Sequence, residues 1–384
     1  MRVVAITTFP PSTYAHSSFA YHTVQRFLES PKIDEIVILS DILNIREKER
    51  ISDRLTVDRC WRYNSSLTLF DLIRTVISYQ PDVIWISLHY THFAKNPALV
   101  ALSLLLPICL KQLGYPVITL LHNFLAVVNP RKMGIKLPES VARSIDKLLM
   151  KSIVSSDTVF TMVEAHEKYL RKHYPSAKIV FIEQDLYQRL PFHPLSIDTK
   201  IILTIGYYGT HKRLELLLDA FQIVKAQHPE AVLRIAGTSH LLRPNYLKEI
   251  MTGYAGRLID VEFLGYVDDI CTPSLFWGSS IVVAPTVENV GSSATLRYAA
   301  MYGRGIVIPR LGYFENFNST EWGTGFYEEG NCSDLAATLC DILSDPIKQV
   351  NMAKMNYQRH INSQDTFVSE HLKVFEALFE AYRE

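Results

Sequence analysis

The chain has 384 residues, a length that suggests two domains. Lys plus Arg and Asp plus Glu number 39 each, so the formal net charge is zero, and this excludes a protein that binds nucleic acid through a broadly basic surface. With 48% hydrophobic and 20% charged residues, the composition is that of a globular protein and not of a disordered one. Five scattered cysteines without a CxxC pair exclude a disulfide framework and a cysteine-based zinc site, and favour a reducing cytoplasm.

Apolar runs in the chain are short. The first, Arg2–Ile6, ends before Pro10 and is shorter than the core of a secretory signal. The longest, Ala98–Leu110, contains Ser103 and Pro107 and is well short of the ~20 residues that cross a bilayer. We therefore predict a buried helix there, and a protein that works in the cytoplasm or at the inner face of the membrane.

Short β-branched runs alternate with amphipathic segments through the first half. Continuous apolar strands separated by helices are typical of a parallel sheet that is buried on both faces. Helical patterns occupy Leu67–Ser78 and Ser140–Val154. The predicted strands are Val3–Thr8, Glu35–Leu39, Val83–Ser87, Val117–Leu121, Thr158–Met162 and Lys178–Ile182.

The alternation stops at Gln184–Lys200, which we interpret as a linker, and then starts again. The second set of strands is Ile201–Ile205, Val232–Ala236, Val261–Leu264, Ile281–Ala284 and Ile306–Ile308. The sequence thus predicts an α/β protein of two doubly wound, Rossmann-like parallel-sheet domains that face a cleft. The expected boundaries are 1–190, 191–364 and a final helix, 365–384, that packs back on the first domain.

The strand Ile201–Ile205 runs into a loop with two glycines, Gly206 and Gly209, before an apolar helix begins. Glycines allow a tight turn, and the free N–H groups of a helix start attract an anion. Lys212 and Arg213 would add positive charge for a diphosphate. The alternative is that both are solvated residues of a first helical turn.

A second such junction follows the apolar strand that ends at Ala284. Gly291, Ser292 and Ser293 at the start of the next helix would form another anion cradle, and Glu288 in the loop could accept hydrogen bonds from sugar hydroxyls. The alternative is that one serine simply caps the helix and that Glu288 is an exposed carboxylate.

Together these segments resemble the nucleotide-sugar domain of retaining GT-B glycosyltransferases of family four. The resemblance covers most of Ile201–Pro346 and depends on the order and spacing of its motifs. Those motifs are Gly206 with Lys212 six residues later, Leu214–Phe221, Val232–Gly237, Val261–Val267, Pro285–Gly291, Gly303–Gly312 and Gly325–Tyr327. It implies a nucleoside-diphosphate sugar, with UDP and GDP both open, as co-substrate, with no other cofactor and no metal.

Two positions depart from the family pattern. Tyr207 stands where a basic residue usually follows the first glycine, and Leu296 stands where a second glutamate usually holds the ribose. With Lys212 as the matched cation, the diphosphate would depend more on backbone N–H groups and Arg213.

The first half resembles the family less closely. By the resemblance, His122, directly after the strand Val117–Leu121, would lie near the transferred sugar; a hydrogen-bonded core histidine is the alternative. His89 and His92 after Val83–Ser87, and His16 after the first strand, are further candidates for contact with the sugar or acceptor. No third ligand at a suitable spacing accompanies His89 and His92, so we do not predict a metal site.

Basic residues are concentrated between Arg131 and Lys151. Arg143, Lys147 and Lys151 recur every four residues, on one face of the predicted helix. Such a patch is suited to contact with an anionic membrane, whereas a merely solvated helix face is the alternative.

The predicted reaction is transfer of a sugar from a nucleoside-diphosphate sugar to an acceptor hydroxyl, with retention at the anomeric carbon, in the synthesis of a cell-surface polysaccharide or glycoconjugate. His122, Lys212 and Glu288 are the expected catalytic residues. A nucleotide-sugar epimerase or a phosphorylase of the same fold is an alternative. A non-catalytic partner subunit is another, because Tyr207 and Leu296 depart from the pattern.

Overall fold

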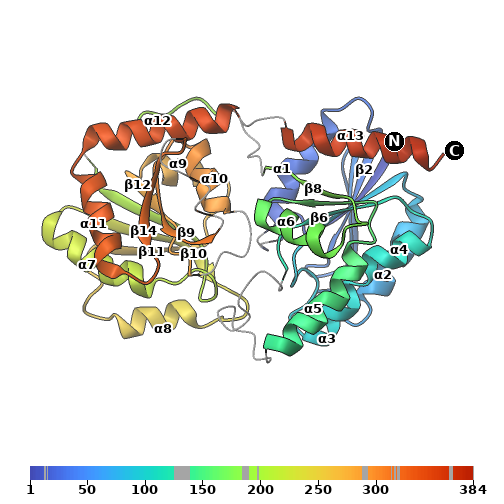
Figure 1. Ribbon diagram of the computed structural model, residues 1–384, viewed down its shortest axis with the longest axis horizontal. Coiled ribbons are helices and arrows are strands. Elements are labelled where there is room, and N and C mark those ends of the chain that lie inside the picture. The colour runs from blue at the N-terminus through green and yellow to red at the C-terminus, as the bar shows by residue number, and fades with distance from the viewer. Residues whose placement is uncertain are drawn as a thin grey trace. The chain divides into compact units, whose positions relative to one another are not determined.

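The computed structural model describes residues 1–12, 14, 16–124, 139–183, 190–196, 199–287, 293–312, 314, 317, 321–362 and 366–383 (Figure 1). The chain forms two compact units. Unit 1 contains Met1–Val127, Leu137–Tyr187 and Asp365–Glu384, and unit 2 contains Gln188–Gln364. Each unit has its own parallel sheet covered by helices, which is the α/β architecture that the alternating sequence predicts.

Unit 1 is built on an eight-stranded sheet in the order β3-β4-β2-β1-β5-β6-β7-β8. All neighbouring strands are parallel except β3 and β4, which form an antiparallel pair at one edge. Its strands are β1 Arg2–Ile6, β2 Glu35–Asp41, β3 Glu47–Ser52, β4 Leu55–Trp61, β5 Val83–Leu88, β6 Val117–Leu121, β7 Thr158–Thr161 and β8 Ile179–Phe181. Its helices are α1 Ser17–Leu28, α2 Thr68–Tyr79, α3 Pro97–Ser103, α4 Leu106–Gln112, α5 Glu139–Ile153, α6 Glu164–His173 and α13 Thr366–Ala381.

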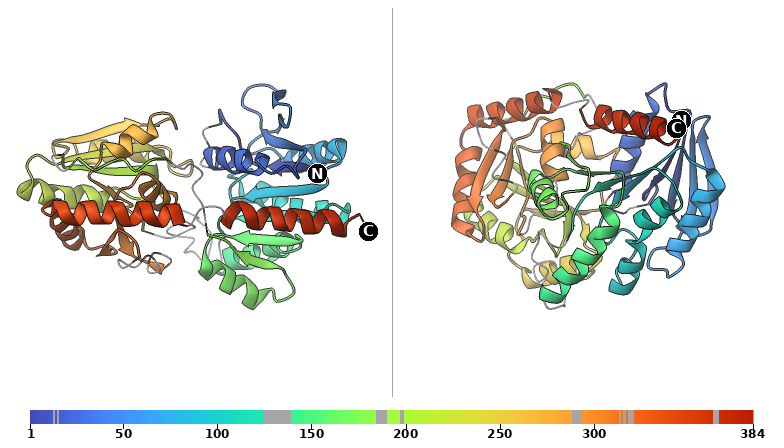
Figure 2. Two further views of the ribbon diagram at one scale, coloured as in Figure 1. Left: turned by 90° about the horizontal axis from the view of Figure 1, so that it is seen from above. Right: turned by 45° about the vertical axis from the view of Figure 1, so that its right-hand side comes forward.

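Both faces of the unit 1 sheet are buried. Along β1, Val4 and Ile6 pack into one core with α2, α4 and α5, whereas Val3 and Ala5 pack into the other with α1 and α13. The C-terminal helix α13 therefore completes unit 1, although unit 2 separates it from the rest of that unit in sequence (Figure 2).

Unit 2 is built on a six-stranded parallel sheet in the order β11-β10-β9-β12-β13-β14. Its strands are β9 Ile201–Tyr208, β10 Val232–Ser239, β11 Val261–Gly265, β12 Ile281–Val283, β13 Ile306–Arg310 and β14 Thr324–Glu328. Its helices are α7 Glu215–Gln227, α8 Tyr246–Gly253, α9 Thr272–Trp277, α10 Ala294–Met301, α11 Cys332–Leu343 and α12 Pro346–Asn362. Since β9 and β12 are parallel neighbours, the loops that follow them leave the same edge of the sheet.

One local prediction is wrong. The apolar run Ala98–Leu110 is not one buried helix: α3 ends at Ser103, and α4 begins again at Leu106 with Pro107 in its first turn. Part of the predicted linker packs on unit 2, where His193 stacks on Trp277 with 4.9 Å between ring centroids. No helix of the described residues is both long enough and apolar enough to cross a bilayer.

Candidate functional site

The loops after β9 and β12 are joined by backbone hydrogen bonds. Arg213 N donates to Pro285 O at 3.0 Å, and Val287 N donates to His211 O at 2.8 Å. Lys212 and Thr286 form an antiparallel bridge between these two bonds. The two strand-to-helix junctions of unit 2 are therefore held together by their backbones.

The side chain of Lys212 lies between these junctions. Its Nζ donates to Thr295 Oγ1 at 2.6 Å and to Ile205 O at 3.0 Å. Thr295 is in the first turn of α10, and its hydroxyl lies 3.2 Å from Ile205 O. A protonated lysine has three N–H donors, so one remains for a ligand at the start of this helix.

The charge of Lys212 is poorly compensated. No carboxylate of the described residues forms an ion pair with it, and burial lowers its pKa to about 8. The ammonium form still dominates at neutral pH. A charged group next to a helix N-terminus and without an opposite charge is a favourable place for an anion.

Gly206 leaves the space that this lysine occupies, and Gly237 leaves space for the backbone of Gly206. Gly206 has φ +153°, and a Cβ built on it would lie 2.7 Å from Lys212 Nζ. A Cβ on Gly237 of the neighbouring strand would lie 1.9 Å from the carbonyl oxygen of Gly206. Neither position accepts a side chain without displacing its neighbour.

Other candidates of unit 2 have different positions. Arg213 is half-buried, and its Nε has no hydrogen-bond partner among the described groups. Ser293 is the N-cap of α10, and its Oγ accepts a hydrogen bond of 3.4 Å from the backbone N–H of Leu296. This is the capping role that the sequence left open, and it is compatible with anion binding. Glu288, Gly291 and Ser292 lie outside the described residues.

The two positions that depart from the family pattern differ in burial. The side chain of Leu296 is fully buried, so it takes part in the core of unit 2. Tyr207 is half-buried on β9, and burial, with Tyr266 and Asp269 nearby, raises its pKa to about 12. It is an uncharged phenol at neutral pH and cannot replace a cation.

In unit 1, three candidate histidines meet at the carboxyl ends of β1, β5 and β6. The rings of His16 and His122 lie 4.2 Å apart and those of His16 and His89 4.9 Å apart, measured between centroids. His122 Nε2 is 2.8 Å from Ser87 Oγ, and Asn123 Nδ2 is 2.8 Å from His89 Nε2. No role was predicted for Ser87 or Asn123, because a hydrogen bond across strands has no local signal in the sequence.

His92 belongs to the same electrostatic group, and neighbouring imidazoles disfavour protonation of His16, His92 and His122. Burial, with His92 nearby, lowers the pKa of His16 to about 3, and burial, with His89 nearby, lowers that of His92 to about 3. The pKa of His122 is well below its usual value because of burial and the other three rings. At neutral pH the rings of His16, His92 and His122 are uncharged hydrogen-bonding groups, which suits sugar hydroxyls better than phosphates.

No group of three or more potential metal ligands is present in the described part of the chain. His92 instead packs against Phe93 and Trp61, with ring centroids 4.7 and 5.7 Å away. Its Nε2 is buried and has no hydrogen-bond partner among the residues that the structure describes.

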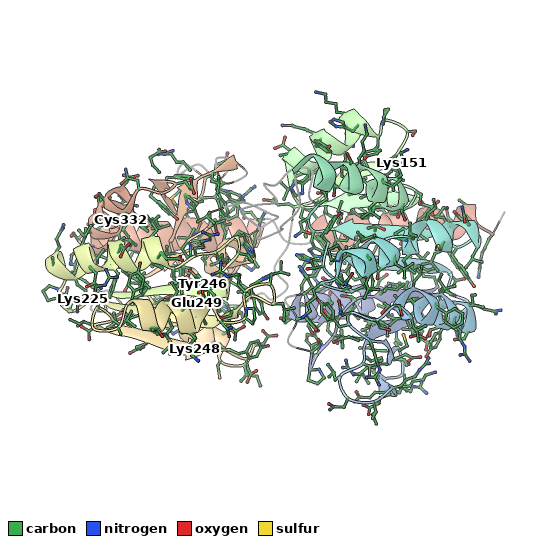
Figure 3. The ribbon with its side chains drawn as sticks, turned by 90° about the horizontal axis from the view of Figure 1, so that it is seen from below. Lys151, Lys225, Tyr246, Lys248, Glu249 and Cys332 are labelled. Carbon is green, nitrogen blue, oxygen red and sulfur yellow. The ribbon has the colours of Figure 1, made fainter. Side chains whose placement is uncertain are left out.

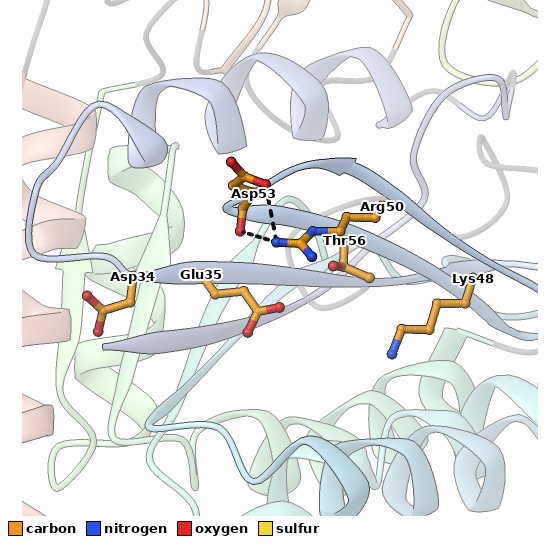
Figure 4. A pocket seen from close by; sticks show the side chains of 6 residues that line it. All are labelled: Asp34, Glu35, Lys48, Arg50, Asp53 and Thr56. Atoms are coloured by element: carbon orange, nitrogen blue, oxygen red, sulfur yellow. Dashed lines mark hydrogen bonds and ion pairs between the residues drawn. The ribbon is translucent and has the colours of Figure 1, made fainter.

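Two further features lie on the surface of unit 1. Lys147 and Lys151 are exposed on α5, and the side chain of Arg143 lies outside the described ones. A polar hollow at the β2–β4 edge is lined by Asp34, Glu35, Lys48, Arg50, Asp53 and Thr56 (Figure 4). Its charges are partly paired, as Arg50 with Asp53 at 3.3 Å, and we assign no role to it.

Residues 199–345 match the family described as glycosyl transferases group 1. No curated protein matches the chain. Among solved structures, sucrose-phosphate synthase from Thermosynechococcus elongatus is similar at 16% identity and a TM-score of 0.79, covering 99% of this chain and 100% of that one. Anabaena HepE, solved with UDP and glucose, is similar at 14% identity and a TM-score of 0.68, covering 99% of both chains.

An α,α-trehalose 6-phosphate synthase from Burkholderia multivorans is similar at 12% identity and a TM-score of 0.70, covering 99% of this chain and 97% of that one. Identities this low show a shared fold. Residues 199–345 thus have the sequence pattern of group 1 glycosyl transferases, and the chain has the two-unit α/β fold of the GT-B glycosyltransferases that it resembles.

Proposed function

We propose that this protein transfers a sugar from a nucleoside-diphosphate sugar to an acceptor hydroxyl, with retention of the anomeric configuration. The observation that carries the proposal is the position of Lys212, whose ammonium lies at the first turn of α10 and has no described carboxylate partner. The family match of residues 199–345 covers both junctions that form this place. HepE, a protein of similar fold, was solved with UDP-glucose, which favours UDP as the nucleotide.

In the proposed reaction, breaking the glycosidic bond leaves negative charge on the departing diphosphate. The Lys212 ammonium and the N–H groups of α10 stabilise that charge, so the protein supplies the positive charge without a metal. Arg213 adds to it. These interactions strengthen as charge develops, which lowers the barrier to bond breaking.

The acceptor hydroxyl attacks the anomeric carbon, and its proton passes to the departing phosphate oxygen. In this proposal Glu288 holds hydroxyls of the sugar, and the uncharged ring of His122 orients the sugar from unit 1. His16, His89 and His92 are the further proposed contacts of sugar or acceptor. We further propose, from the family resemblance, that the reaction belongs to the cytoplasmic synthesis of a cell-surface polysaccharide or glycoconjugate.

Calorimetric titration with UDP and GDP tests the nucleotide site. We expect one nucleotide to bind, Lys212→Ala to lose that binding, and Lys248→Ala on α8, an exposed lysine outside both loops, to retain it. Failure of both nucleotides to bind at millimolar concentration would overturn the proposal.

Product analysis with each UDP-sugar then separates the reactions that this fold supports. Transfer requires an acceptor and gives an anomeric configuration, read by NMR, equal to that of the donor. An isomerised nucleotide sugar formed without acceptor would show that the protein is an epimerase. Phosphate-dependent release of a sugar phosphate would show that it is a phosphorylase. Binding without turnover would show a non-catalytic subunit.

A further inference from the structure

The helices α2, α4 and α5 form one layer on the sheet of unit 1. Helix α4 contacts both α2 and α5, and the inner sides of all three pack into one core. Their outer side and the residues that flank them leave large apolar side chains in solvent. These are Leu67, Phe70, Ile77, Leu105, Leu113 and Leu148, and Phe70 and Leu148 expose 60% and 67% of their surface.

The exposed charges of this layer have one sign. The exposed basic residues are Arg74 on α2 and Lys147 and Lys151 on α5. Among the side chains that the structure describes on these three helices, no acidic one is exposed. Asp146 of α5 is buried. Asp71 of α2 is half-buried on the side of Cys60, whose pKa its charge helps to raise. The whole chain has equal numbers of acidic and basic residues, so the charges here are segregated.

We propose that this layer, the α2–α4–α5 face, docks on an anionic phospholipid surface. Large apolar side chains that lie among basic ones are suited to a bilayer interface, where the apolar groups enter the acyl boundary and the cations meet lipid phosphates. A second copy of the chain fits this face less well, because like charges would meet across the interface. Nucleic acid would leave the apolar groups without partners.

The exposed side chains divide the interaction into two parts that mutations can separate. Each basic residue near the surface of an anionic membrane contributes about fivefold in partitioning, and this part weakens as salt rises. The apolar residues contribute a part that salt does not screen. A surface that acts only through scattered charges would lack the second part.

Co-sedimentation of the full chain with vesicles tests the docking. We expect binding to vesicles of equal phosphatidylcholine and phosphatidylglycerol, and little to phosphatidylcholine alone. The double variant Lys147→Glu/Lys151→Glu should lower the partition at least about 25-fold. Its matched control is Lys248→Glu/Lys354→Glu, which changes exposed lysines of α8 and α12 and the net charge equally, and it should bind as the unchanged chain does (Figure 3 labels Lys151 and Lys248).

A second pair tests the apolar part. Phe70→Ser/Leu148→Ser should weaken binding in high salt, whereas Ile270→Ser/Ile347→Ser, at two highly exposed positions of unit 2, should not. The proposal would be overturned if either double variant on the α2–α4–α5 face changed binding no more than its control double variant does. A concentration-dependent dimer that Phe70→Ser/Leu148→Ser abolishes would also overturn it, because it would assign the face to a second copy. No nucleotide is present in these experiments, so their outcome is independent of the proposed sugar transfer.

Discussion

At the scale of single residues, the position of the Lys212 ammonium is set by a hydroxyl, a carbonyl and a glycine that has no side chain. Thr295 and Ile205 accept hydrogen bonds from its ammonium, and Gly206 leaves the space. The bonds hold the charge in place, but they are neutral partners and do not offset the cost of burying it. The lysine is therefore held ready for an anionic ligand.

Nucleotide binding should take up a proton at alkaline pH. The pKa of Lys212 is about 8 in the free protein, and a bound diphosphate should raise it above that value. UDP binding should then take up roughly 0.9 proton at pH 9 and roughly 0.1 at pH 7. The measurement is the binding enthalpy in buffers of different ionisation enthalpy. Lys212→Arg, whose side chain stays charged, should bind without this uptake; equal uptake by that variant would assign the proton elsewhere.

Adding one methyl group at Gly206 should displace the Lys212 ammonium from its position. In Gly206→Ala the Cβ would lie 2.7 Å from Lys212 Nζ, so the ammonium must move, and UDP affinity should fall by about tenfold or more. Gly256→Ala is the control, because Gly256 has φ +83° but a Cβ there would meet no atom within 4 Å beyond its chain neighbours. That variant should lose stability through backbone strain and keep UDP affinity. Calorimetry measures the UDP affinity of both variants. Unchanged affinity in Gly206→Ala would contradict a role for the position of the Lys212 ammonium in UDP binding.

At the scale of elements, α13 is the part of unit 1 whose packing depends on residues far away in sequence. Phe367 and Phe375 are fully buried, and His371 stacks on Phe160 with 4.1 Å between centroids. Trp85 of β5 lies in the same core. The helix thus fills a place in the sheet's helical cover, and unit 1 should not be stable without it.

Removing the Phe375 ring should destabilise unit 1 specifically. Phe375→Ala leaves a cavity in a fully buried site and should lower the unfolding free energy of that unit by about 3–5 kcal/mol. Phe379→Ala, at a partly buried position one turn later, should cost less. Urea unfolding followed by hydrogen exchange of peptides from each unit measures this. Equal loss of protection in the peptides of both units would be inconsistent with α13 belonging to unit 1.

The sequence predicted elements where a run was uniformly apolar. This held for β1, β5 and β6, and the α/β fold class is confirmed. It failed for β3, all of whose residues are exposed, and for β4, where Asp58 and Arg59 interrupt a buried strand. Those charges are buried because partners lie across the fold: Asp58 accepts a hydrogen bond from Tyr79, and Arg59 donates to the Phe9 carbonyl.

The candidate site divides in the same way. The glycines and cations of the β9 loop stood out because they are adjacent in sequence. Thr295 did not, because its contact with Lys212 spans 83 positions and depends on two loops that leave the same sheet edge. Local chemistry can be predicted from local sequence, whereas a hydrogen bond between two loops requires the fold.

At the scale of the whole molecule, the two units differ in how many of their described histidines have a pKa that burial lowers. Unit 1 has five described histidines whose pKa burial lowers: His16, His92, His122, His166 and His371. In unit 2 the pKa of His240 is lowered by burial. Below pH 6.5 an unfolded chain binds protons on these side chains that folded unit 1 does not, so acid favours unfolding of unit 1.

Mild acid should therefore lower the stability of unit 1 more than that of unit 2. The folded pKa values of His16, His92, His166 and His371 are about 3 to 4, so unfolding free energy should be lost as pH falls from 6.5 toward 4. Calorimetric scans at pH 7 and pH 5 measure it, with the unit 1 transition assigned by its shift in Phe375→Ala. His371→Leu should reduce the effect. Equal shifts of both transitions would contradict this reading of the buried rings.

The backbone bridge between Lys212 and Thr286 has a consequence for engineering. Because Arg213 and Val287 complete the same ladder, the two loops cannot be exchanged one at a time without breaking main-chain pairing. A chimera meant to change donor preference should carry both segments from one parent. A chimera that carries only one of the two loops should fold but lose backbone hydrogen bonds between them.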